Sequence, residues 1–200
     1  MDRRSSTKRL ERAKGEIRAL LDEKTPHPLV GDALAPAEEM FTAAPYQLGP
    51  WILRMLEVRF GRSRFDAWLK AWSKDERHLA VTTDAFLAFM REVSGEDVSA
   101  WFTAWSTLRE LPTVVDRSRV TGNKAHIHLK SKGRLPPDLA LPVMLEGEGG
   151  RTFAAHVVPN APITLDAGFP IRAMRIDPGR EVLCDVIRGA TRLQTGLPPV

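Results

Sequence analysis

The only tyrosine of the chain, Tyr46, combines a reactive side-chain type with a setting that could make it useful. It lies in the stretch Ala44-Pro45-Tyr46-Gln47-Leu48-Gly49, which leads directly into the helical pattern Trp51-Ile52-Leu53-Arg54-Met55-Leu56. A phenol held at a turn before a buried helix can be rigid, and a rigid O–H donor can stabilise the oxyanion that forms on a reacting carbonyl. The alternative interpretation is a half-buried aromatic that packs on the first turn of that helix.

Two histidines, His126 and His128, form a second candidate group. They alternate along the predicted strand 125–129, so both imidazoles lie on one face at a spacing that can bind a metal. A catalytic zinc needs about three protein ligands, and no third ligand is evident nearby in the sequence. We therefore favour a solvated strand face and predict no metal site in this chain.

Helical spacing of apolar residues dominates the first half of the chain. It predicts helices over 8–21, from near 46 to about 60, over 65–72, from 82 to 94 and over 98–105. Prolines and glycines between 25 and 36 predict an ordered loop or linker. The tryptophans and phenylalanines of the last two helices are expected in the core, not as a platform for stacking bases.

After Pro112 the pattern changes to short alternating or β-branched runs that predict strands. These runs are 114–115, 125–129, 141–145, 153–158, 163–165, 173–176 and 182–186. Clusters of Gly, Pro, Asn and Asp separate them, which is typical of an antiparallel sandwich. The predicted fold class is α+β, with a helical half-domain followed by a small antiparallel β-sandwich. The predicted boundaries are 1–35 for an amphipathic helix and linker, 36–111 for helices, 112–190 for the sandwich and 191–200 for a tail.

Composition excludes several classes of protein. The chain has 200 residues, of which 43% are hydrophobic and 27% charged, so it can bury a core. Its single cysteine cannot form an intramolecular disulfide or a cysteine-based zinc cluster. The net charge of +4 comes largely from basic residues before position 25. No aromatic or glycine-rich segments of the kind that contact nucleic-acid bases are interleaved with them. We expect a solvated helix face there, with membrane-surface or nucleic-acid binding as alternatives, and we predict no nucleic-acid partner, no membrane span and a cytoplasmic protein.

From Tyr46 onward, an ordered series of residues makes the chain resemble the gluzincin aminopeptidases, the zinc metallopeptidases that include aminopeptidase N. The series covers roughly residues 36–116, and its order and spacing are more specific than any single member. It reads Pro45-Tyr46-Gln47-Leu48-Gly49, Leu53, Leu56, Gly61, Phe65, Thr82-Thr83-Asp84, Phe86, Met90, Ser94-Gly95, Asp97, Trp101-Phe102, Trp105 and Pro112. The strand-rich remainder is similar to the family's small β-sandwich domain.

This resemblance implies a role for Tyr46 as a catalytic residue. In the family, the tyrosine at this position donates a hydrogen bond to the tetrahedral intermediate, opposite a zinc that polarises the same carbonyl and activates water. Gln47 and Leu48 replace the family's common acidic and basic pair, and Glu110 stands where a glycine usually precedes the proline. None of these departures removes the phenol.

The family's zinc site is absent from the sequence. It requires H-E-x-x-H on one helix and a later glutamate, and none of the five histidines here is followed by Glu. The resemblance therefore implies a C-terminal part of a gluzincin aminopeptidase that lacks the zinc ligands and the catalytic Glu and is inactive alone. Zinc and a peptide substrate are expected only in the complete enzyme, where another polypeptide could supply the N-terminal catalytic half. The alternative is a non-enzymatic interaction module or split-enzyme subunit.

Overall fold

The computed structural model describes residues 3–22, 43–74 and 82–189. Within these ranges the chain divides into two compact units. The first runs through Leu111 and also includes 136–138 and 179–183, and the second takes the rest from Pro112 onward. Most of the expected linker, the boundary at 35/36 and the C-terminal tail lie outside the described residues.

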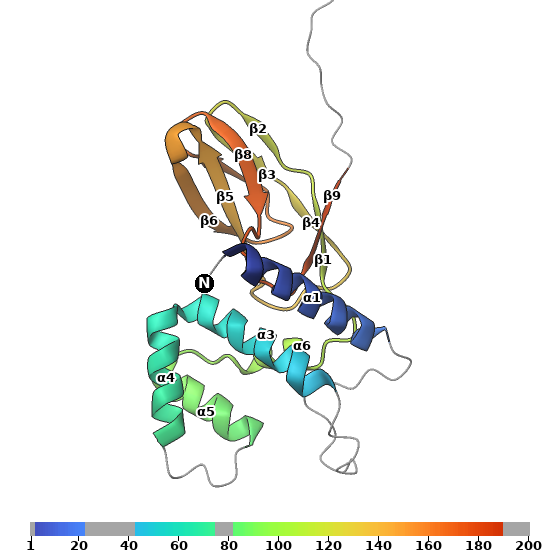
Figure 1. Ribbon diagram of the computed structural model, residues 1–200, viewed down its shortest axis with the longest axis vertical. Coiled ribbons are helices and arrows are strands. Elements are labelled where there is room, and N and C mark those ends of the chain that lie inside the picture. Colours follow the sequence, from blue (N-terminus) through green and yellow to red (C-terminus); the bar gives the residue numbers. More distant parts are fainter. Residues whose placement is uncertain (1–2, 23–42, 75–81, 190–200) are drawn as a thin grey trace, which may run out of the picture. The chain divides into compact units, whose positions relative to one another are not determined.

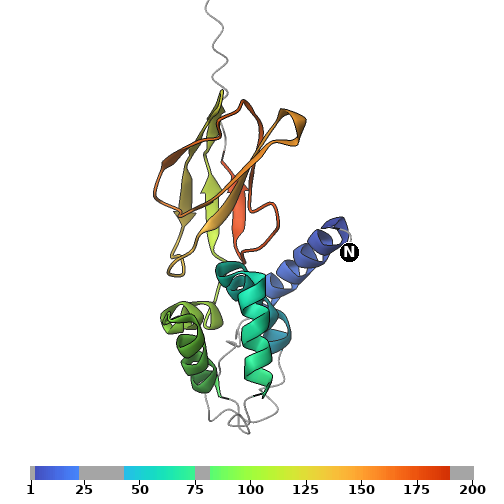
Figure 2. The same ribbon diagram turned by 90° about the vertical axis from the view of Figure 1, so that its left-hand side faces the viewer.

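Five helices make up the described part of the helical unit (Figures 1 and 2). They are α1 (Arg3–Leu21), α3 (Ala43–Phe60), α4 (Arg62–Lys74), α5 (Thr83–Ser94) and α6 (Ser99–Ser106). Helix α3 packs against α1, α4 and α6, and α4 packs against α5. The central position of α3 follows from its sequence, because apolar residues at helical spacing cover most of its circumference.

The helical core is built from aliphatic and aromatic side chains of the described helices. Ile17, Leu48, Ile52, Leu56 and Trp105 are each almost completely buried. Edge-to-face and tilted ring contacts join Trp72 to Phe86 and Phe89, and Phe86 to Phe102. These rings therefore act as packing elements, as the sequence pattern predicted.

Nine strands form the described part of the second unit, in three three-stranded sheets with the orders β4-β1-β9, β2-β3-β7 and β6-β5-β8. The strands are β1 (Thr113–Asp116), β2 (Arg119–Thr121), β3 (Lys124–Ile127), β4 (Leu129–Lys132), β5 (Leu141–Gly147), β6 (Thr152–Val157), β7 (Ile163–Asp166), β8 (Ile171–Ile176) and β9 (Asp185–Arg188). Alternation explains the central strand β5, where Leu141, Val143 and Leu145 are buried and the residues between them are not.

The α+β fold class is confirmed, and two details of the strands differ from the sequence expectation. Strands β1 and β9 pair in parallel, whereas the other strand pairs are antiparallel. The expected strand 182–186 is displaced, because Val182, Leu183 and Cys184 are buried outside any strand and β9 starts at Asp185. Among the described helices, none is long and apolar enough to cross a membrane.

Candidate functional site

Tyr46 is the fourth residue of α3 and lies in its first helical turn, not in a turn that precedes the helix. Its side chain is 70% exposed. The half-buried aromatic of the alternative interpretation is therefore not what the structure shows, because the ring is open to solvent.

Two prolines, Pro45 and Pro50, lie in the first half of α3, and only Pro45 is in its first turn. Pro45 is the third helical residue, where no intrahelical N–H bond is required and a φ near −65° already suits a helix. Pro50 lies inside the helix and has no N–H, so the bond that residue 50 would donate to the Tyr46 carbonyl cannot form. The sequence expectation placed a turn here and the start of the helix near residue 46, whereas α3 begins at Ala43.

The neighbours of Tyr46 fix the rotation of α3 about its axis. Leu48 is 1% exposed and belongs to the core, while Gln47 Nε2 donates a hydrogen bond to Glu16 Oε2 of α1 at 3.3 Å. Gln47 and Leu48 are two of the three positions at which the sequence departs from the family pattern, and the third is Glu110. The first two now have a structural role, since Leu48 fills the core and Gln47 joins α3 to α1.

The exposed face of α3 continues from Tyr46 into an apolar groove. Gly49, Pro50 and Leu53 follow Tyr46 by three, four and seven residues, so they lie on its side of the helix. All three line a groove of about 510 Å³, whose lining does not include Tyr46 itself. The other lining residues belong to α3, α4, α5 with its N-cap Thr82, and α6. They are Ile52, Leu69, Trp72, Thr82, Thr83, Phe86 and Phe102.

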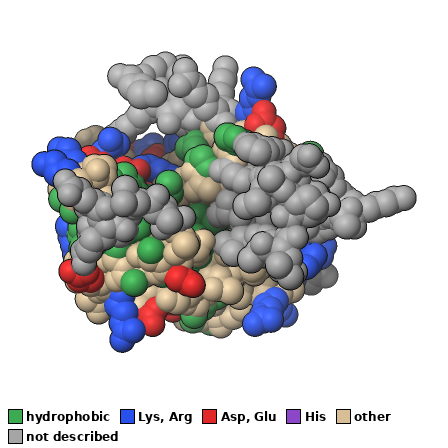
Figure 3. Space-filling view, turned by 90° about the horizontal axis from the view of Figure 1, so that it is seen from below, with side chains coloured by type: hydrophobic (Ala, Val, Ile, Leu, Met, Phe, Trp, Pro, Cys, Tyr) green, Lys and Arg blue, Asp and Glu red, His purple; other side chains and the backbone are tan. Residues whose placement is uncertain are grey.

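Two leucines of this groove, Leu53 and Leu69, are each 38% exposed. Figure 3 shows hydrophobic side chains among charged ones on the face of the molecule seen from below. The sequence analysis missed the groove. A signal in the sequence could have revealed it, because Leu53 of α3 and Leu69 of α4 lie outside the buried apolar faces of their helices.

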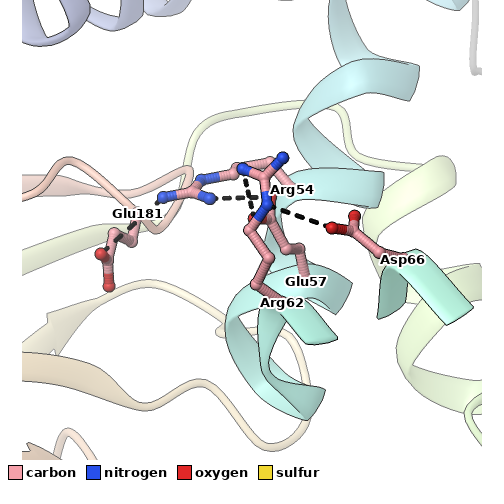
Figure 4. Close-up of polar contacts among 5 residues, drawn as sticks. All are labelled: Arg54, Glu57, Arg62, Asp66 and Glu181. Atoms are coloured by element: carbon pink, nitrogen blue, oxygen red, sulfur yellow. Dashed lines mark hydrogen bonds and ion pairs between the residues drawn. The ribbon is translucent and has the colours of Figure 1, made fainter. Parts of the chain in front are cut away.

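A carboxylate between two arginines holds the end of α3 near the start of α4 (Figure 4). Glu57 accepts a hydrogen bond from Arg54 at 2.7 Å and forms an ion pair with Arg62 at 3.4 Å. Arg62 also pairs with Asp66 at 3.3 Å, and Arg54 lies 3.9 Å from Glu181. The Glu57 side chain is only 15% exposed, so these contacts are partly shielded from water.

The part of the chain that the structure describes does not fit a zinc site. It contains no group of three or more His, Cys, Asp or Glu residues that could hold a metal ion. His126 and His128 lie in the β unit, where His126 Nδ1 is 3.1 Å from Thr164 Oγ1. Tyr46 belongs to the helical unit, so the two candidate groups of the sequence belong to different units.

Known proteins give matches that each cover a small part of the relative. Aminopeptidase M1-C of Oryza sativa subsp. japonica is 31% identical over 77 residues, which are 38% of this chain and 9% of that protein. Aminopeptidase M1 of Arabidopsis thaliana is 28% identical over 94 residues, or 47% of this chain and 11% of that protein. These matches therefore cover about a tenth of the length of the curated relatives. No protein-family model matches the chain.

A comparison with solved structures also finds an aminopeptidase. The crystal structure of Legionella pneumophila aminopeptidase A in complex with aspartic acid aligns with 76% of this chain and 18% of its own, with a TM-score of 0.62 and 17% identity. At this identity the alignment establishes the fold alone. Taken with the sequence matches, it shows that the chain is similar to a C-terminal part of an aminopeptidase N-like enzyme.

Proposed function

We propose that the chain is a C-terminal segment of a zinc-dependent, aminopeptidase-like metallopeptidase and that it is inactive alone. In the complete enzyme, the Tyr46 O–H would stabilise the oxyanion that forms during peptide-bond hydrolysis. The observation that carries this proposal is the exposure of Tyr46, the single tyrosine, on a chain similar in sequence and fold to aminopeptidases. The packing of α3 fixes the backbone of Tyr46, and the exposed side chain leaves its hydroxyl available to a substrate carbonyl.

The groups present in this chain determine which parts of the reaction it could carry out. A phenol can donate a hydrogen bond to developing negative charge, but it cannot generate hydroxide at neutral pH. The described residues contain no set of metal ligands. The metal ligands and the catalytic carboxylate would therefore be supplied by residues outside the described part or by another polypeptide. The residues of this chain would position the phenol and cover the neighbouring surface.

Substitution of Tyr46 by phenylalanine tests the catalytic role. Tyr46→Phe keeps the ring and removes only the hydroxyl, so in the complete, active enzyme we expect kcat to fall by about 10²-fold or more with little change in the unfolding midpoint. The matched control is Phe86→Tyr or Phe86→Leu, which alters a groove ring without touching the phenol. Unchanged kcat in the Tyr46→Phe enzyme would remove the proposed role.

A direct assay tests inactivity of the isolated chain. With a fluorogenic aminoacyl amide and added Zn²⁺, we expect no turnover above the protein-free rate. Turnover that a chelator abolishes would show that the chain holds a working metal centre after all. Sequencing the coding DNA upstream of Met1 adds an independent readout, since an in-frame H-E-x-x-H segment there supports the proposed origin.

The second candidate function is a non-enzymatic interaction module or split-enzyme subunit. The apolar groove with the partly exposed Leu53 and Leu69 favours it, because a groove of this kind offers apolar surface that another polypeptide could cover. Size-exclusion chromatography with light scattering separates the candidates when the chain is mixed with the polypeptide that carries the zinc ligands. A stable complex without peptidase activity supports the module, whereas a complex with Tyr46-dependent activity supports the enzyme.

A further inference from the structure

Basic side chains form a regular array on one face of the β2-β3-β7 sheet. The strand registers place Arg119 opposite His126, and His126 opposite Thr164. Two residues along, the Arg117 N–H donates to the His128 carbonyl at 2.9 Å, so Arg117 and His128 form the next row of the same antiparallel arrangement. Because residues two apart share a face of a strand, the two arginines and two histidines lie on one side.

This basic array, Arg117, Arg119, His126 and His128, lines a cavity of about 300 Å³. The lining also includes the Thr164 hydroxyl and contains no carboxylate. Within the described part of the chain, no ion pair joins Arg117 or Arg119 to an acidic residue, while many of the other arginines do form such pairs.

The nearest acidic side chain along β7 is engaged elsewhere. Asp166, two residues beyond Thr164, lies opposite Lys124 in the register of β3 and β7. Its carboxylate accepts hydrogen bonds from Asn123 Nδ2 at 2.8 Å and from the Gly168 N–H at 2.9 Å. The positive charge of the array is therefore not neutralised by this neighbour.

The two arginines decide what kind of ligand the histidines can serve. Guanidinium groups stay protonated at any ordinary pH, and their positive charge opposes a cation bound to His126 and His128. The same groups present forked N–H donors that match the oxygens of a phosphoryl group, and imidazole N–H and threonine O–H groups add further donors. The chemistry of the cavity therefore favours an anion over a metal ion.

We propose that the basic array binds the phosphoryl group of a small phosphate monoester. The cavity is open to solvent, and its volume of about 300 Å³ accommodates one such group with a small organic substituent. A single-stranded nucleic acid fits less well, because the cavity lining contains no Phe, Tyr or Trp on which a base could stack. This site is independent of the proposed peptidase role, since its residues all belong to the β unit.

Titration of the full-length ¹⁵N-labelled chain with inorganic phosphate and with phenyl phosphate, followed by NMR at constant ionic strength, tests the proposal. We expect saturable shifts of the backbone amides of Ser118, Arg119 and His128. The double variant R117Q/R119Q should raise Kd by about tenfold or more, because it removes two charge-assisted donors. The control R134Q/R172Q removes the same formal charge from the same unit, outside the cavity lining, and should leave Kd within about twofold.

Several outcomes would overturn the site. One is linear, unsaturated shifts with both phosphate ligands, and another is an equal loss of affinity in the control variant. Acetate binding as tightly as phosphate would overturn the preference for a phosphoryl group. Saturable binding of Zn²⁺ alone that His126→Ala abolishes, without phosphate binding, would make the array a metal site instead.

Discussion

At the scale of single residues, Glu57 is an acidic side chain that contacts arginines of two helices. It accepts from Arg54 within α3 and pairs with Arg62 at the start of α4. We expect Glu57→Gln to lower the free energy of unfolding by about 1 kcal/mol, because a shielded, charge-assisted hydrogen bond is lost. Urea denaturation monitored by circular dichroism measures the change.

The matched control for Glu57 is Asp66, which pairs with the same Arg62 but is more exposed. Exposed pairs four residues apart on a helix contribute only about 0.3–0.5 kcal/mol. Asp66→Asn should therefore have the smaller effect. An effect of Asp66→Asn equal to that of Glu57→Gln would contradict the view that burial makes the difference.

Asp97 gives a pH-dependent prediction. Hydrogen bonds from the Ser99 side chain and then from the Ser99 N–H lower the pKa of its carboxyl below the ordinary value of 3.8, and Arg91 adds a smaller electrostatic effect. Since the folded-state pKa is the lower one, the contribution to stability is complete above pH 3.8 and is lost as the pH falls through the folded pKa.

We therefore expect Asp97→Asn to destabilise the protein at pH 7 and to have less effect at pH 3. The measurement is urea denaturation of both proteins at the two pH values. Glu92→Gln removes the same charge from an exposed position of α5 and serves as the control. A stability difference that is the same at pH 3 as at pH 7 would show that the Ser99 bonds do not depend on the carboxylate charge.

At the scale of elements, helix α5 has clear signals at both ends. The Thr82 hydroxyl accepts a hydrogen bond from the Ala85 N–H at 3.1 Å, and Gly95 ends the helix with φ 74°. A hydroxyl residue at the N-cap and a glycine after the last turn are common end signals of helices. This helix could be located from sequence because its start and stop depend on local chemistry.

Two glycines allow opposite predictions for the same substitution. Gly95 has positive φ, so Gly95→Ala should cost about 1 kcal/mol of unfolding free energy. Gly15 lies inside α1, and a Cβ added there would meet no atom within 4 Å. Gly15→Ala should therefore stabilise the protein by about 0.5–1 kcal/mol. Thermal unfolding of the two variants checks the signs, and a shift of both melting temperatures in one direction would refute the argument.

Other elements could not be located from sequence because their determinants are not local. Strand β2 was missed, since Arg119, Val120 and Thr121 are all exposed and show no alternation of burial. The start of α3 was missed because a proline is compatible with a first helical turn as well as with a loop. Which of these occurs depends on the packing of Leu48 and the contact of Gln47 with α1.

The candidate site was predicted in part. The sequence singled out Tyr46, and the structure shows it exposed, but its catalytic role stays a prediction. The apolar groove beside it joins residues of α3, α4, α5 and α6, and no sequence pattern specifies such a joint surface. The basic array was visible in the sequence only as His126-x-His128. Arg119 belongs to β2 and Arg117 lies just before it, so the register of β2 and β3 and the bond from the Arg117 N–H to the His128 carbonyl were needed to find them.

At the scale of the whole molecule, the groove predicts binding of a hydrophobic dye. Leu53→Asp introduces a charge into the groove at a site that is already 38% exposed, so dye fluorescence should fall while the unfolding midpoint changes little. Ile187→Asp is the control, because Ile187 is exposed on β9 of the other unit. An equal decrease in both variants would show that the dye does not report on the groove.

The parallel pairing of β1 with β9 joins the first and last of the strands that the structure describes in the β unit, with Thr113 opposite Asp185 and Asp116 opposite Arg188. Because the two strands run in the same direction, a pulling force applied at Thr113 and Arg188 acts along the strands and loads their hydrogen bonds together in shear. An antiparallel pair held at neighbouring ends would instead unzip one bond at a time. The β unit should therefore resist mechanical extension more strongly than its small size suggests.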